Sequence, residues 1–144
     1  VTTHVGGALD PRYTPIEVTG KVQMLSDGDF YNEVEGEPWR AGNCAVLKVN
    51  NITLVLMSKP VNLHNRSLFF AHGLFPEKFD LVIVKSPHCQ DHMYKSWATT
   101  YINVDAPGST SANLPTLGHT ICRRPIFPLD LDMEYVPEIS VYRR

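Results

Sequence analysis

Apolar and polar residues alternate along the first part of the chain, as they do in half-buried β-strands. From Ile16 to Leu25 apolar side chains occupy nearly every second position, and Gly20 interrupts the run at a place where a bulge is expected. The segment from Val1 to Val5 predicts a further short strand that ends at Gly6-Gly7. Two strands are therefore expected before residue 26.

A β-hairpin is predicted between Cys44 and Met57. The runs Cys44 to Val49 and Ile52 to Met57 are both rich in strand-forming residues, and Asn50-Asn51 joins them. Asparagine tolerates the positive φ that a two-residue hairpin turn demands. The two runs should pair directly with each other.

The middle of the chain predicts a strand–helix–strand crossover. Leu81 to Val84 is a continuous apolar run, the pattern of a strand that is covered on both faces. Ser86-Pro87 supplies a helix N-cap and a proline suited to the first helical position, and apolar residues then recur at helical spacing, Trp97 among them. A second strand from Tyr101 to Val104 would lie parallel to the first.

These elements predict an α+β fold. It would be a mixed, mainly antiparallel β-sheet with a β-hairpin, one βαβ crossover and few helices, in a single domain spanning residues 1–144. One short helix is expected between Asn65 and His72, with Gly73 as its left-handed stop. Residues Asp27 to Glu37 carry five acids and no base, which we interpret as a solvated loop because the spacing matches no calcium loop.

Composition narrows the class of protein. With 43% hydrophobic and 19% charged residues the chain is typical of a globular domain, and a net charge of -2 gives no general attraction to nucleic acid. The three cysteines contain no C-x-x-C pair, which argues against a disulfide framework and a cysteine zinc site and favours the cytoplasm. The longest apolar runs are too short to cross a membrane.

The turn from Lys85 to His88 is the first candidate site. It lies where a strand would end and a helix begin, and free backbone N–H groups, the helix dipole and the Lys85 ammonium group would favour an anion there. The alternative is an ordinary strand-to-helix turn with a surface lysine. His88 and His92 have the i, i+4 spacing of a metal pair but lack a third ligand, so we expect no metal site.

Two loops are further candidates. Gly108 to Ser111 is too short for a phosphate-binding P-loop and is interpreted as a loop at a strand end that lines a cleft through Ser109. The segment Arg123 to Pro128 is expected to be extended, and its large apolar residues favour packing against the domain over display as a proline-rich ligand.

The ordered set of motifs resembles one known family. V-T-T-H-V-G-G-A-L-D-P, P-I-E-V-T-G-K-V, L-S-D-G, H-G-L-F-P-E-K-F-D-L-V-I-V-K-S-P, I-N-V-D-A-P-G-S-T and C-R-R-P-I-F-P-L-D occur in the order found in the C-terminal domain of the MlrC (microcystinase C)-like zinc metallopeptidases. This family was first known from the degradation of linearised microcystin. The resemblance covers nearly the whole chain and makes Lys85-Ser86 part of the family pattern.

The resemblance implies the function of an accessory domain. In that family the zinc ligands and the general base lie in a larger N-terminal domain, so this chain would be an N-terminally truncated part of a longer hydrolase. It would support the catalytic domain and line its cleft, without catalytic residues or a metal of its own. The expected partners are that catalytic domain and a peptide or amide substrate, which need not be microcystin.

Two other classes of function stay open from sequence. One is a stand-alone module that binds a small anion at Lys85-Ser86, and the other is an oligomerisation domain. For the accessory-domain hypothesis we expect Gly6-Gly7, the Lys85-Ser86 turn and the Asp105 to Ser111 loop, which contains Ser109, to form a shared surface, because capped and glycine-rich turns gather at the carboxyl edge of parallel strands. His88 and Arg124 are further candidates for contact with a ligand or with the catalytic domain.

Overall fold

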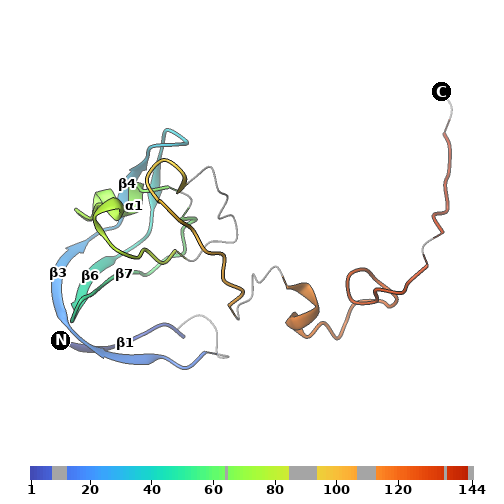
Figure 1. Cartoon of the computed structure of the whole chain (residues 1–144), viewed down its shortest axis with the longest axis horizontal. Helices are drawn as coiled ribbons and strands as arrows, with labels where there is room; N and C mark the ends of the chain where they lie inside the picture. Colours follow the sequence, from blue (N-terminus) through green and yellow to red (C-terminus); the bar gives the residue numbers. More distant parts are fainter. Residues whose placement is uncertain (8–12, 64, 85–93, 107–112, 135, 143–144) are drawn as a thin grey trace. The chain divides into compact units, whose positions relative to one another are not determined.

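The computed structural model describes residues 1–7, 13–63, 65–84, 94–106, 113–134 and 136–142. The chain divides into two compact units, Val1–Tyr101 and Ile102–Arg144. Figure 1 shows the chain coloured from one end to the other, and each unit is described by itself below.

The first unit is built from antiparallel strands. Strands β1 and β2 form one sheet, β3, β6 and β7 a second, and β4 and β5 a third. The mainly antiparallel architecture with few helices is confirmed, but the described strands lie in three sheets and not in one mixed sheet. The strands are β1 (Thr2–Val5), β2 (Ile16–Thr19), β3 (Lys21–Ser26), β4 (Asp29–Asn32), β5 (Glu37–Arg40), β6 (Cys44–Val49) and β7 (Ile52–Met57).

The single strand predicted from Ile16 to Leu25 is divided at Gly20 into β2 and β3. The chain passes so close to β6 here that a Cβ atom on Gly20 would lie 2.6 Å from the Lys48 carbonyl oxygen. Before Gly20 the chain pairs with β1, and after it with β6. The irregularity expected at Gly20 falls slightly later, because the register of β3 against β6 shifts between Val22 and Met24.

Strands β6 and β7 have the bounds that the sequence predicts. They pair antiparallel from Cys44↔Met57 to Val49↔Ile52. Asn50 adopts a φ of 52°, so it supplies the left-handed backbone of the turn. The β3–β6–β7 sheet is built around this pair.

The acidic stretch is more ordered than a solvated loop. Strands β4 and β5 pair antiparallel, with Phe30 opposite Trp39, and the two rings lie 6.3 Å apart. The acids are compatible with strands because Asp29 faces Arg40, with 3.6 Å between the carboxylate and the guanidinium group, and Glu37 accepts a hydrogen bond from the Trp39 indole. The loop interpretation is wrong for Asp29–Asn32.

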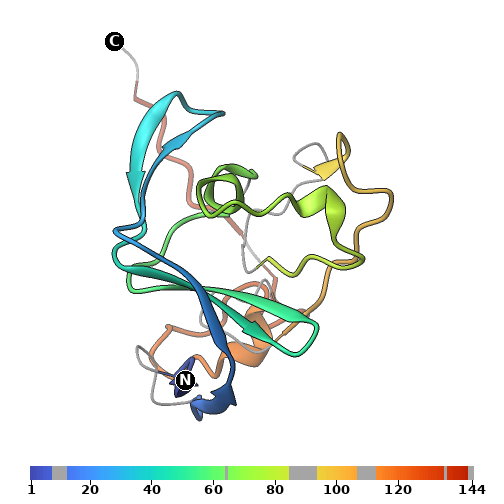
Figure 2. The ribbon, with the colours of Figure 1, turned by 90° about the vertical axis from the view of Figure 1, so that its left-hand side faces the viewer.

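Helix α1 (Ser67–Ala71) covers the core of this unit. Leu68 packs with Ala41 and Cys44, and Val55 and Met57 of β7 pack against that group. In Figure 2 the helix lies on one side of the strands that carry these residues. The Asn65 side chain accepts a hydrogen bond from the Ser67 N–H at 2.9 Å, so the asparagine predicted at the start of the helix does bond its first turn.

Gly73 ends helix α1 as predicted. Its φ is 68°, its N–H bonds the Phe70 carbonyl, and the Leu74 N–H bonds the Phe69 carbonyl. This pair of bonds is the Schellman arrangement of a helix C-terminus. A short 3₁₀ helix, Pro76–Lys78, follows.

The predicted crossover is not confirmed. Residues 81–84 and 101–104 are in no strand, and Leu81 and Ile83 are 73% and 84% exposed. A strand without a neighbour cannot form a ladder, so apolar pattern alone does not create one. Most of the helix predicted from Pro87 lies outside the described residues, but Tyr94 is buried and contacts Trp97 edge to face at 5.6 Å.

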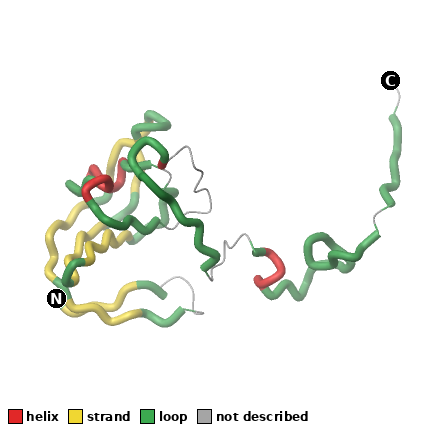
Figure 3. Tube along the Cα trace, in the orientation of Figure 1, coloured by secondary structure: helices red, strands yellow, loops and turns green. Residues whose placement is uncertain are grey.

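The second unit consists mainly of loops. Its only described helix is the 3₁₀ helix Leu114–Leu117, which Figure 3 shows in red between loop segments. None of its described residues is buried. Across the described part of the chain, no helix has the length and apolar character needed to cross a bilayer.

Candidate functional site

Gly6 and Gly7 have a clear backbone role. Their φ values are 77° and 70°, in the left-handed region that favours glycine. A Cβ atom on Gly7 would lie 2.6 Å from the Tyr13 carbonyl oxygen, whereas one on Gly6 would meet nothing within 4 Å. Gly7 is therefore required by the close approach of the segment that precedes β2, and Gly6 sits in open space. Their role in a ligand or domain surface stays a prediction.

Four of the predicted site residues lie outside the described residues: Lys85, Ser86, His88 and Ser109. His92, the second histidine of the metal pair considered above, also lies outside the described residues. The shared surface that these residues would form with Gly7 stays a prediction.

Arg124 organises a closed loop in the second unit. Its Nε and Nη2 atoms both bond the Asp130 carboxylate, the Nε contact at 2.5 Å, and Nη2 also donates to the Leu129 carbonyl at 3.2 Å. Asp130 accepts a further hydrogen bond from the Ile126 N–H at 2.7 Å. The arginine side-chain hydrogen bond and the Ile126 N–H lower the pKa of Asp130 to about 2.

This loop corrects the expectation of an extended, packed segment. The N–H groups of Leu129 and Asp130 turn back to the Ile126 carbonyl, and Phe127 is 71% exposed. The peptide bonds before Pro125 and Pro128 are both cis. The carboxylate of Asp130, six residues after Arg124, gives the chain a local partner that favours the turn over an extended course.

A serine–histidine pair, of which the histidine is buried, joins two elements of the first unit. The Ser26 hydroxyl of β3 lies 2.9 Å from His72 Nε2, and His72 Nδ1 lies 2.7 Å from the Leu68 carbonyl oxygen of α1. A carbonyl can only accept, so Nδ1 carries the proton, and in the neutral ring Nε2 accepts from Ser26. The sequence does not indicate the partner of His72, because Ser26 is distant along the chain.

The same arrangement activates serine nucleophiles in other proteins. Here His72 is only 5% exposed and Ser26 is half-buried, so the imidazole is shielded from a substrate. Burial also raises the pKa of the neighbouring Cys44 thiol, whose Sγ donates to the Gly42 carbonyl at 3.2 Å. We interpret the group as a structural tie between β3 and α1.

Asn32 ties the β4–β5 turn to helix α1. Its side-chain oxygen accepts from the Val34 and Glu35 N–H groups and from the Asn65 amide at 3.0 Å. The Ser67 hydroxyl accepts from the Glu33 N–H at 2.9 Å. Asn32 is 1% exposed, so this hub fixes the tip of the hairpin against the helix.

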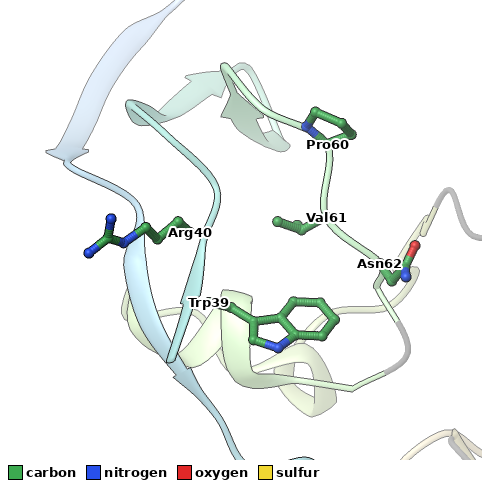
Figure 4. A pocket seen from close by; sticks show the side chains of 5 residues that line it. All are labelled: Trp39, Arg40, Pro60, Val61 and Asn62. Carbon is green, nitrogen blue, oxygen red and sulfur yellow. The ribbon is translucent and has the colours of Figure 1, made fainter. Parts of the chain in front are cut away.

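A surface hollow of about 340 Å³ lies beside strand β5. Its lining residues are Trp39, Arg40, Pro60, Val61 and Asn62. Figure 4 shows the Trp39 indole next to Val61 and Asn62, while the Arg40 guanidinium points away from them. The hollow offers an aromatic face and one amide, but its lining supplies no nucleophile and no general base.

The family resemblance places its zinc in an N-terminal domain outside this chain, and that expectation stays a prediction. Within the described ranges, no three side chains of the types His, Cys, Asp and Glu converge on one point. A catalytic zinc site needs three protein ligands and an open position.

Comparison with known protein families gives one match. Residues 1–120 match the family described as MlrC C-terminus. The chain belongs to this family. The resemblance seen in its motifs is thereby confirmed, and the match includes every strand and helix of the first unit as well as the start of the second.

One solved structure is similar to this MlrC C-terminal chain along most of its length. It is titled "Crystal structure of Putative metallopeptidase from MESORHIZOBIUM SP. BNC1", with 26% sequence identity and a TM-score of 0.78. The match covers 94% of this chain but only 28% of that chain, so the present chain spans less than a third of the solved protein. Among curated proteins none matches significantly.

Proposed function

We propose that this chain is the C-terminal accessory domain of a zinc-dependent peptidase or related amidohydrolase. It would support a catalytic domain in the same polypeptide and line its cleft, with no turnover of its own. The observation that carries this proposal is the family match over residues 1–120. The similar solved protein, titled a putative metallopeptidase, supports it because most of that longer polypeptide lies outside the match.

Zinc belongs to the companion domain in this proposal. A metal-bound water would attack the amide carbonyl there, which is the chemistry that a catalytic zinc ion supplies when bound. The role of the present chain is to shape and close one wall of the cleft. The candidates for that wall are Lys85 and Ser86, whose ammonium and hydroxyl groups could contact a substrate carboxylate.

The first experiment compares the 144-residue chain with the longer polypeptide encoded by its gene, here called the parent. Both are purified without chelator and analysed for zinc and for hydrolysis of a peptide library. We expect stoichiometric zinc and hydrolysis in the parent and neither in the isolated chain. Stoichiometric zinc in the isolated chain, bound through His88 and His92, would contradict the proposal.

A second experiment tests the cleft wall. Lys85→Ala in the parent should lower kcat/KM by about tenfold or more if the ammonium group contacts the substrate, because a charged hydrogen bond contributes roughly 1.5–3 kcal/mol. Lys21→Ala, which changes an exposed lysine of β3, is the control. Equal kcat/KM values for the two variants would argue against Lys85 as a cleft residue.

Sedimentation of the isolated chain separates this proposal from an oligomerisation domain. An accessory domain without its companion needs no defined self-association. A stable symmetric oligomer that forms from the isolated chain and persists unchanged in an inactive parent would favour the oligomerisation function instead.

A further inference from the structure

The second unit has the composition of a folded segment but the burial of an unfolded one. Disordered segments are poor in large apolar residues, whereas this segment is rich in isoleucine, valine, leucine and aromatic residues. Most of those side chains are nevertheless exposed in the described part of the unit. The exposed fractions are 95% for Ile121, 71% for Phe127, 76% for Leu131, 86% for Val136, 78% for Ile139 and 93% for Tyr142.

Burial within the unit does not offset the free-energy cost of ordering it. Fixing the backbone of one residue costs about 1–2 kcal/mol, and burial of a large apolar side chain returns roughly 1.5–3 kcal/mol. None of its described residues is fully buried, so burial within the unit offsets little of that entropy cost. Its apolar side chains therefore need a surface from outside the unit.

One part of the unit is already shaped for binding. The anchor loop, Arg124 to Asp130, is closed by the Arg124–Asp130 ion pair and by the N–H groups of Ile126, Leu129 and Asp130. Phe127 lies at the turn of this loop and is exposed. A loop that its own hydrogen bonds already close loses less conformational entropy on binding than an open one does, and aromatic residues with neighbouring arginines are typical of interface hot spots.

We propose that the anchor loop is the docking element for the companion domain of the parent, with Phe127 inserted into an apolar pocket on that domain and the apolar residues after it laid along the same surface. This inference rests on the proposed function, because it names the surface through which the accessory domain is held.

The companion domain is the occupant that the observations favour. The solved relative carries most of its polypeptide outside the match, and that match covers 94% of the present chain, more than residues 1–120 alone can supply. The similarity therefore extends into the segment that contains the anchor loop. A domain in the same polypeptide also has a high effective concentration, which suits an arm that has little core of its own.

Hydrogen exchange in the parent and in the isolated 144-residue chain tests the proposal. The peptide that covers residues 126–134 should exchange at least about tenfold more slowly in the parent, because docking of the arm excludes solvent and restricts local opening. Phe127→Asp in the parent should remove that protection. Val34→Asp, which places a carboxylate at an apolar position that is 66% exposed in the first unit, is the matched control and should leave the protection unchanged.

Four results would overturn the docking proposal. The peptide could exchange equally fast in the parent and in the isolated chain, or Val34→Asp could reduce protection as much as Phe127→Asp does. Protection that is already complete in the isolated chain, whether as a monomer or through a second copy, would also exclude the companion domain as the occupant. A gene that encodes no further domain has the same consequence.

The same preparations keep the two proposals apart. Zinc content and peptide hydrolysis of the wild-type parent report on the proposed function, and exchange of residues 126–134 reports on docking. A protected anchor loop in a parent without zinc or hydrolysis would reject the function and retain the docking. An active zinc-containing parent with an unprotected loop would do the reverse.

Discussion

At the scale of single residues, a few polar side chains join elements that are distant along the chain. Asn32 bonds the turn after β4 and also Asn65, which precedes α1. His72 bonds both α1 and β3. Each bond is modest, but a buried polar group that loses its partner costs more than the bond itself contributes. These residues should therefore matter to stability well beyond their number of contacts.

His72→Leu tests this at one position. Leucine fills similar space but leaves the Leu68 carbonyl and the Ser26 hydroxyl without their partner, so we expect a loss of roughly 1–3 kcal/mol in the free energy of unfolding. Urea denaturation followed by circular dichroism measures it. His119→Leu, at an exposed position in the second unit, should change the value by less than about 0.5 kcal/mol. Equal effects of the two substitutions would show that the His72 bonds contribute nothing.

Asp130 gives a prediction for pH. Because its pKa in the folded loop is lowered to about 2, from the ordinary 3.8, the contribution of its carboxylate is complete above the ordinary value and is lost as the pH falls toward 2. The anchor loop should thus stay closed at neutral and weakly acidic pH. A carboxyl-carbon NMR titration should give Asp130 this low pKa, and Arg124→Gln should return it toward the ordinary value. An unshifted Asp130 in the wild-type chain would mean that the loop is open.

At the scale of elements, the strands depend on where the backbone of one can approach that of another. Gly20 permits the contact with Lys48 that lets one chain segment leave β1 and join β6. The β6–β7 hairpin depends less on distant residues, because its two strands are joined by Asn50-Asn51 and pair with each other.

Gly20→Ala should therefore destabilise the first unit. The added Cβ atom would collide with the Lys48 carbonyl, and overpacking of this kind costs about 1–3 kcal/mol. Thermal unfolding by calorimetry measures the loss. In Gly36→Ala the new Cβ atom would meet only the Tyr31 hydroxyl, at 3.6 Å, so its loss comes from the positive φ of Gly36 and not from a collision. Gly20 has no positive φ, so the loss in Gly20→Ala reports the collision. If Gly20→Ala unfolds no earlier than the wild type, the close approach is absent.

At the scale of the whole molecule, the two units differ in how they are stabilised. The first has a buried core around Leu68, Ala41 and Cys44, whereas the described part of the second has none. The expectation that residues 1–144 form a single domain stays a prediction. The contrast fits a protein whose second part is completed by a partner.

Limited digestion of the isolated chain with trypsin should reveal this contrast. Arg123 is exposed in the second unit, whereas Lys48 lies in the central strand β6, which pairs on both sides. Cleavage after Arg123 should therefore precede cleavage after Lys48, as followed by mass spectrometry, because a protease needs locally unfolded backbone. In urea the two bonds should be cut at comparable rates. Earlier cleavage after Lys48 in the native chain would contradict the assignment of the stable unit.

Local pattern by itself determined the elements that depend on near neighbours. The β6–β7 hairpin, the glycine stop of α1 and the membership of the family could all be read from the sequence, because turn residues and ordered motifs act over short distances. Only three of the predicted site residues, Gly6, Gly7 and Arg124, fall in the described part. For these the sequence indicated the place but not the partner, as with Asp130 for Arg124.

Only the tertiary structure decided which strands pair and which apolar residues are covered. The split of the predicted Ile16 to Leu25 strand between two sheets occurs where Gly20 approaches Lys48. The acidic hairpin follows from the pairing of β4 with β5, and the serine–histidine tie from a contact between β3 and α1. The run Leu81 to Val84 has the pattern of a covered strand and yet is in no strand. Apolar pattern states which surface can be buried, but burial itself needs a partner that the sequence of one segment does not specify.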